Sequence, residues 1–123
     1  MTAPDLDTAR QFQSAAEDAL RSGDFEPLAA LLTPDVECVM PVHTLHGADA
    51  LADELRRARP GETFDLDFES GEWKVLGNGR CFCEFRVFYR SKVADDLSYS
   101  RDRSFELTIS DGKVSRFEMR FDG

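Results

Sequence analysis

The chain has 123 residues, 41% of them hydrophobic, which is enough for one core and one domain over residues 1–123 but leaves no room for a second. Its net charge of −9 argues against a nucleic-acid partner, because phosphate binding needs clusters of Lys and Arg. No apolar run approaches the about 20 residues of a membrane span, and the N-terminus MTAPDLDTAR does not resemble a secretory signal, so we expect a cytoplasmic protein without membrane partners.

Apolar residues at three- and four-residue steps predict three helices in the first half of the chain. Gly23 suits the end of the first helix, which starts at Asp5 or Asp7. Asp24 is expected to cap a short second helix, and Thr33-Pro34-Asp35 to break it. The predicted helices cover residues 5–21, 24–32 and 48–59.

A short strand is expected over residues 36–40, and both histidines fall in the loop that follows Pro41. From Phe64 onward the apolar period changes to two, which is typical of strands with one buried face. Turn signals at Gly77-Asn78-Gly79 and Asp111-Gly112 predict hairpins. The predicted later strands cover residues 64–69, 73–76, 81–90, 97–109 and 114–121.

Helices followed by long hairpins predict an α+β domain. We expect the three N-terminal helices to pack in the concave face of a curved, mostly antiparallel sheet, a cone-shaped α+β barrel with a cavity at its open end. The early strand at 36–40 must then pair with a strand from much later in the chain. Long strands curve through bulges, so strict alternation is expected to slip somewhere in them.

Three segments carry a resemblance to a known family: SGDFEPLAALLTPDVECVMP at 22–41, HGADAL at 46–51 and SDGKVSRFEMRFD at 110–122. With them, essentially the whole chain resembles the nuclear transport factor 2-like superfamily, in its SnoaL-like and ketosteroid-isomerase-like branch. The resemblance implies the cone-shaped fold. It does not imply one activity, because this superfamily contains isomerases, cyclases and hydrolases as well as non-catalytic binding proteins.

The resemblance places other residues where two groups of relatives carry their catalytic side chains. Ketosteroid isomerases have an Asp base before the proline that ends the first strand, and that position is Met40 here. Their two oxyanion donors fall near Ala16 and at Arg103. Epoxide-hydrolase-like members use an Asp–Arg–Asp set, of which the chain keeps Arg101 but has Arg103 and Met119 for the carboxylates. Both catalytic sets are therefore predicted to be absent.

Arg101 and Arg103 are candidate catalytic residues, as electrostatic stabilisers, because alternation puts them on the inward face with Tyr99. A buried guanidinium must meet an anion, a carboxylate or water. Either one of them binds an anionic or carbonyl-bearing ligand, or a bulge turns both to the rim beside carboxylates. His43 is the candidate proton-transfer group, with a solvated loop histidine as the alternative.

Aromatic and thioether side chains are predicted to line an apolar cavity. We expect a small-molecule-binding domain for a hydrophobic or weakly anionic metabolite with a carbonyl or carboxylate, with acid–base catalysis of isomerase, cyclase or hydrolase type as one outcome. The alternative is a non-catalytic binding or assembly module whose own side chains fill the pocket. The predicted ligand-binding residues are Met40, Trp73, Phe85, Tyr89, Tyr99 and Met119.

The outer sheet face is predicted to mix Phe82 and Phe88 with charges of both signs. Because related proteins commonly dimerise through this face, we expect a homodimer.

Three strand carboxylates, Glu37, Glu118 and Asp122, could act in a site, although Glu118 is expected to point outward in an ion-pair ladder.

The three cysteines are an odd number, which does not suggest a disulfide scaffold. Cys38, His43 and His46 do not have the spacing of a zinc site. We therefore expect buried cysteines that act as small apolar residues, and no metal or organic cofactor.

Overall fold

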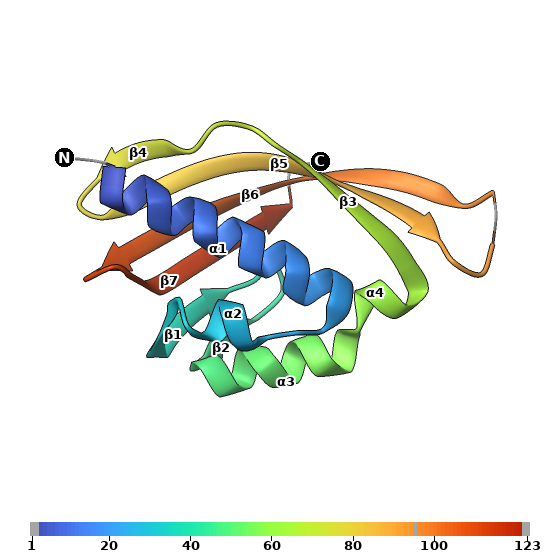
Figure 1. Cartoon of the computed structure of the whole chain (residues 1–123), viewed down its shortest axis with the longest axis horizontal. Coiled ribbons are helices and arrows are strands. Elements are labelled where there is room, and N and C mark those ends of the chain that lie inside the picture. The colour runs from blue at the N-terminus through green and yellow to red at the C-terminus, as the bar shows by residue number, and fades with distance from the viewer. Residues whose placement is uncertain (1–2, 95, 122–123) are drawn as a thin grey trace.

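The computed structural model describes residues 3–94 and 96–121, so the candidate carboxylate Asp122 lies outside the described residues. The chain forms the predicted α+β domain, in which the first helix runs across one face of a curved sheet (Figure 1). None of the described helices combines the length and the apolar character needed to cross a membrane. The helices are α1 (Ala3–Ser22), α2 (Glu26–Ala29), α3 (Ala48–Ala58) and α4 (Pro60–Thr63).

Seven strands form one sheet in the order β2-β1-β7-β6-β5-β3, with β4 paired to β5. The early strand β1 pairs in parallel with the last strand β7, and all other pairs are antiparallel. A register shift between Thr108 and Ile109 marks the bulge expected in a long, curved strand. The strands are β1 (Leu32–Val39), β2 (Thr44–His46), β3 (Phe64–Ser70), β4 (Lys74–Gly77), β5 (Arg80–Ser91), β6 (Ser98–Ser110) and β7 (Lys113–Phe121).

The second helix is shorter than predicted. It begins at Glu26 with Phe25 rather than the expected Asp24 as its N-cap, although the Asp24 carboxylate does accept a hydrogen bond from the Glu26 backbone N–H at 3.2 Å. However, α2 ends at Ala29, and Leu32–Asp35 belong to β1 rather than to a helix end and a break. The physical reason is pairing with β7, because the Val114 N–H donates to the Leu31 carbonyl at 2.7 Å.

Two further predictions of irregular structure were wrong, the first because of strand pairing and the second because of a proline at a helix start. Thr44–His46, expected in a loop, form β2, because Leu45 and Thr44 pair with the end of β1. Pro60-Gly61, expected only to end the third helix, opens the single turn α4 instead. A proline suits the first turn of a helix, where its missing N–H has no partner to lose.

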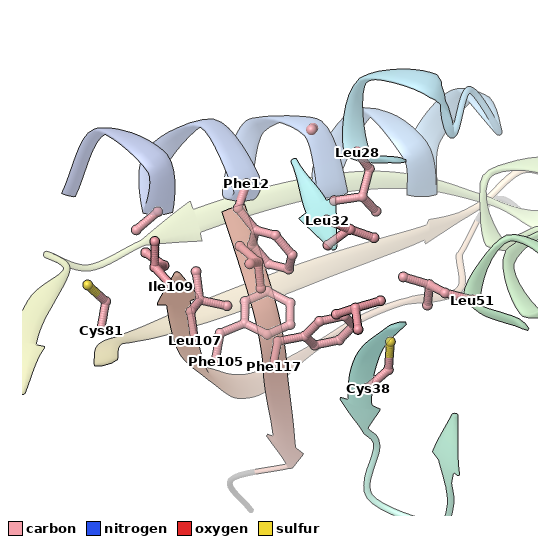
Figure 2. Packing of buried hydrophobic residues seen from close by; sticks show 14 of the residues in the cluster. Phe12, Leu28, Leu32, Cys38, Leu51, Cys81, Phe105, Leu107, Ile109 and Phe117 are labelled. Carbon is pink, nitrogen blue, oxygen red and sulfur yellow. The ribbon is translucent and has the colours of Figure 1, made fainter. Parts of the chain in front are cut away.

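The core forms where α1 meets the sheet. Phe12 is 1% exposed, and its ring lies 5.5 Å from the ring of Phe105 and 5.3 Å from that of Phe117, centroid to centroid (Figure 2). Ala9 and Ala19, on the same helix face, are also buried, and their small side chains let the helix approach the strands. Aromatic contacts of this kind add about 0.5–1.5 kcal/mol each beyond the area that they bury.

All three cysteines are buried and free, as predicted. Desolvation by burial, followed by the nearby charge of Glu37, raises the pKa of Cys38 to about 11. This thiol therefore stays protonated near neutral pH and packs as a small apolar side chain.

The outer sheet face carries the predicted ladder of ion pairs. Arg116 donates to the Glu37 carboxylate at 2.7 Å, and Arg120 donates to Glu118 at 2.8 Å. The hydrogen bond from Arg120 is the main cause that lowers the pKa of Glu118, with the charges of Arg120 and Arg116 adding to it. Glu118 thus points outward and is explained by structure alone.

Gly61 brings α4 against the last turn of α1. A Cβ atom at this position would lie 2.1 Å from the carbonyl oxygen of Arg21, which is closer than any real contact. Only glycine therefore lets the backbones of these two helices meet, and this contact fixes the entry of the chain into β3.

Replacing Gly61 with alanine should lower the free energy of unfolding by about 1–3 kcal/mol, because the two backbones must move apart. Urea unfolding followed by circular dichroism measures the loss. Gly71→Ala is the matched control, since its Cβ would lie 3.2 Å from the Glu84 carbonyl oxygen and needs only a small adjustment. Equal losses in the two variants would contradict the close contact at Gly61.

Replacing Glu118 with glutamine should lower the free energy of unfolding by about 0.5 kcal/mol at neutral pH. Because the folded-state pKa of Glu118 is depressed, its stabilising effect is present above the ordinary value of 4.5 and is lost as the pH falls through the folded-state pKa. The difference between wild type and Glu118→Gln should therefore vanish in acid. Urea titrations over a pH series test this, with Glu72→Gln at an exposed site outside the ladder as control. A difference that persists unchanged in acid would be inconsistent with the ladder.

Candidate functional site

A cavity of about 200 Å³ lies between α1 and the sheet. Helix α1 forms one wall, strands β3, β5, β6 and β7 form the other, and Pro60 of α4 borders it. Many of its side chains are only partly buried, and Phe121 is 53% exposed, so the cavity reaches the surface. Its lining is mainly apolar and consists of Gln13, Ala16, Glu17, Leu20, Pro60, Leu66, Phe68, Phe85, Val87, Tyr89, Arg103, Phe105, Met119 and Phe121.

Strand register explains which sheet residues reach the cavity. Residues directly opposite each other in an antiparallel pair share a face. Phe85 is opposite Arg103, and Arg103 is opposite Phe121, so three neighbouring strands each add a side chain at the same level. On the helix side Ala16 is small, which leaves space between α1 and the strands.

Four of the nine predicted site residues meet in this cavity: Arg103, Phe85, Tyr89 and Met119. Their placement agrees with the alternation that predicted them. Phe85 also stacks on Phe105, with ring centroids 4.8 Å apart, and so belongs to both the cavity wall and the aromatic core.

Three predicted ligand-binding residues lie elsewhere. Met40 is half-buried against the core at the end of β1, and its backbone N–H donates to the His43 carbonyl at 2.9 Å. Tyr99 lies farther along the β5–β6 hairpin, stacked on Tyr89 with ring centroids 4.7 Å apart. Trp73 packs against the core, and its ring nitrogen Nε1 donates to Gln13 Oε1 at 2.7 Å.

Two predicted catalytic residues also lie outside the cavity lining. Arg101 is exposed, and its guanidinium carbon Cζ lies 4.7 Å from the centroid of the Tyr99 ring. His43 is an exposed residue of the β1–β2 turn, where its Nε2 lies 3.6 Å from a carboxylate oxygen of Glu54. Proton transfer by His43 stays a prediction, and its surroundings are those of a surface histidine.

Arg103 reaches the cavity from β6. Its Nη1 donates to the backbone oxygen of Asp102 at 3.0 Å, and its Cζ lies 3.9 Å from the centroid of the Phe121 ring. Among the described residues, no carboxylate lies within salt-bridge distance of this guanidinium. The Asp102 carboxylate instead binds Arg86, whose Nε donates to it at 2.7 Å. Arg103 is therefore a cation at an apolar cavity with capacity to bind an anionic oxygen.

Two polar residues of the helix wall, Gln13 and Glu17, were not among the predicted site residues. They lie one turn apart on α1, and Gln13 Nε2 donates to Glu17 Oε2 at 3.0 Å. Gln13 Nε2 also donates to the Ser70 hydroxyl, and its Oε1 accepts from Trp73. The available signal was their spacing with Ala16 and Leu20, a second stripe beside the buried face.

The cavity has no built metal site. Within residues 3–94 and 96–121, no group of three or more His, Cys, Asp or Glu side chains is placed to hold a metal ion. The polar chemistry of the lining is that of one carboxylate, one amide, one guanidinium and the Tyr89 phenol.

A curved sheet around a long first helix, with a cavity between them, defines the nuclear transport factor 2-like class of α+β domains. Within this class the chain belongs to the SnoaL-like family, because the model of the SnoaL-like domain matches residues 13–117. No curated protein sequence matches the chain.

Three solved structures illustrate the shared fold. A nuclear transport factor 2-like protein from Anabaena variabilis superimposes with a TM-score of 0.82 at 13% identity, covering 100% of this chain and 93% of the other. One from Burkholderia xenovorans gives 0.75 at 23% identity, covering 99% and 92%. TerC, co-crystallised with polyporic acid, gives 0.74 at 23% identity, covering 97% and 92%. At these identities the likeness concerns the fold alone.

Proposed function

We propose that the cavity binds a small hydrophobic molecule that carries a carboxylate or carbonyl group, with Arg103 as the residue that holds this group. One observation carries the proposal: a guanidinium lines an apolar cavity and has no carboxylate partner among the described residues. The Arg103 guanidinium is partly exposed, so water solvates it when the cavity is empty, and a ligand carboxylate would replace this water with a charge-assisted hydrogen bond.

The size of the cavity limits the ligand. An apolar cavity of about 150 Å³ accommodates one benzene ring, whereas pockets for drug-sized molecules are about 300–1,000 Å³. A cavity of about 200 Å³ therefore suits one ring with a few substituent atoms. A four-ring steroid exceeds this volume, which agrees with the absence of an Asp base at Met40.

Acid–base turnover would require a proton-transfer group beside the bound ligand. Glu17 is the one carboxylate of the cavity lining, and it supports this role better than His43 does. In a carbonyl-bearing substrate, Arg103 would stabilise negative charge that develops on the oxygen. The co-crystal of TerC with polyporic acid supports small-molecule binding as a use of this fold.

Replacing Arg103 with glutamine should weaken binding of benzoate, a one-ring carboxylate probe, by about tenfold to a hundredfold, because a hydrogen-bonded ion pair is lost. Titration followed by ligand-observed NMR measures the dissociation constant, and circular dichroism checks the fold. Arg80→Gln is the matched control, since it removes an arginine that pairs with Glu106 on the outer face.

Two results would contradict this assignment. Unchanged benzoate affinity in Arg103→Gln would exclude Arg103 as the anchor, and loss of binding in Arg101→Gln alone would move the role to Arg101. If no benzoate binds to the wild type, the alternative of a module without a ligand is favoured.

We also propose that the chain forms a homodimer through the outer sheet face. Phe88 of β5 is 39% exposed there, between Asp67 of β3 and Ser100 of β6 in the cross-strand register. An exposed aromatic ring among polar neighbours is typical of an interface anchor. Two residues away along β5, Arg86 pairs with Asp102 of β6, and such charges of both signs beside the ring suit self-complementary pairing of two copies.

Replacing Phe88 with lysine should raise the dissociation constant of the dimer at least tenfold, since it puts a charge where an apolar ring is covered. Analytical ultracentrifugation over a concentration series measures this. Val93→Lys is the control, because Val93 is 84% exposed in the β5–β6 turn, outside the sheet face. A wild-type chain that sediments as a monomer at high concentration would exclude the dimer.

A further inference from the structure

We infer that the cavity selects a one-ring aromatic carboxylate with a hydroxyl group on the ring, and that Glu17 is the residue that recognises the hydroxyl. This inference rests on the proposed function, because it assumes that Arg103 holds the carboxylate. It adds a second charged group to the site. We call the Arg103 guanidinium and the Glu17 carboxylate the two poles of the cavity.

The two charged groups belong to different walls of the cavity. Glu17 comes from α1, whereas Arg103 comes from β6 in the sheet that α1 crosses (Figure 1). They form no ion pair with each other in the described part of the chain. A molecule bound between the helix and the sheet can therefore contact a cation on one side and a carboxylate on the other.

The Glu17 carboxylate has one oxygen engaged and one available. Its Oε2 accepts the hydrogen bond from Gln13. Its Oε1 forms an ion pair with Nη1 of Arg21 at 3.9 Å, which is too long for a hydrogen bond, so among the described residues this oxygen accepts no hydrogen bond and can take one from a ligand. The side chain is 22% exposed, so it is partly shielded from water that would otherwise satisfy this oxygen. A ligand hydroxyl that donates to Oε1 would complete the coordination of the carboxylate.

Gln13 holds this arrangement in place. The Trp73 N–H fixes Gln13 Oε1 at 2.7 Å, which turns the amide nitrogen toward Glu17 and Ser70. Trp73 is thus a positioning residue outside the cavity lining. Trp73 was predicted to contact the ligand, and here it acts instead through Gln13.

Charge favours a hydroxyl over the other groups that could approach Glu17. A second carboxylate would be repelled by Glu17, so a diacid is disfavoured. An ammonium group would meet the guanidinium of Arg21, which already lies near Oε1 and also stacks 5.0 Å from the centroid of the Phe68 ring. A neutral donor avoids both repulsions.

The walls favour a flat ring between the two poles. Aromatic side chains from four strands, Phe68, Phe85, Phe105 and Phe121, line the cavity together with Tyr89. Aromatic pairs gain from offset or edge-to-face contacts that an aliphatic chain does not make. The volume of about 200 Å³ allows one such ring with its substituents.

The test uses benzoate, 3-hydroxybenzoate, 4-hydroxybenzoate and their methoxy analogues as probes of the wild-type chain. One hydroxybenzoate should bind at least tenfold tighter than benzoate, and its methoxy analogue, which cannot donate, should lose this gain. Ligand-observed NMR gives the dissociation constants. In Glu17→Met, of similar length but without an acceptor oxygen, the ratio of the hydroxybenzoate to the benzoate affinity should fall to about one, whatever the change in benzoate affinity itself.

Further variants separate the two poles. Arg103→Gln should weaken benzoate and hydroxybenzoate equally and leave their ratio unchanged. Trp73→Phe, which keeps an aromatic ring but removes the N–H donor, should lower the ratio of hydroxybenzoate to benzoate affinity. Glu17→Leu, which also lacks an acceptor oxygen, serves as a second variant if Glu17→Met fails to fold, and should also lower this ratio.

Each result has a separate meaning. If benzoate binds through Arg103 but the hydroxyl brings no gain, or if Glu17→Met keeps the gain, the inference is wrong while the proposed function stands. If 4-(aminomethyl)benzoate binds better than either hydroxybenzoate, the pole takes a cation and the inference is also wrong. If no benzoate binds at all, the proposed function itself is overturned.

Discussion

The contact of Phe12 with Phe105 and Phe117 is the constraint on which the rest of this structure depends. It sets the distance between α1 and the sheet, because three rings fill the space between the helix and the central strands. One turn later the helix carries Ala16 instead of a large side chain. The distance between the helix and the sheet is the same at Ala16, so the space that its small side chain does not fill becomes the cavity. Packing in the core thus creates the site beside it.

Much of the fold could be predicted from local signals. Periodicity located α1, α3 and the long strands, and the isolated early strand implied a late partner, which is β7. Two of the errors arose where strand pairing, with a distant segment or within a hairpin, overrides local preference. Leu31 and Leu32 fit a helical face, yet their backbone joins Val114. Thr44–His46 was expected in a loop, but this segment pairs with the end of β1. A single sequence gives no signal for such contacts.

The candidate site divides in the same way. Strict alternation was enough to bring Phe85, Tyr89, Arg103 and Met119 together, because a strand has only two faces. It could not place Tyr99, Trp73 or Met40, since the depth of the cavity depends on where α1 ends and how the sheet bends. Glu17 and Gln13 escaped notice because polar residues next to an apolar helix face usually contact water. Their role emerges only once the opposite wall is known.

The contact at Gly61 has a consequence for how ligands of different length could be accommodated. Pro60 and Leu20 border the cavity next to the place where the backbones of α4 and α1 touch. A boundary made by two backbones in contact cannot be widened by the rotation of a side chain. Phe121, the last residue of β7, also lines the cavity, but it is a half-exposed side chain rather than a backbone contact. A substitution at Phe121 would therefore change the space for a ligand, whereas a substitution at Pro60 or Leu20 would leave the backbone boundary in place.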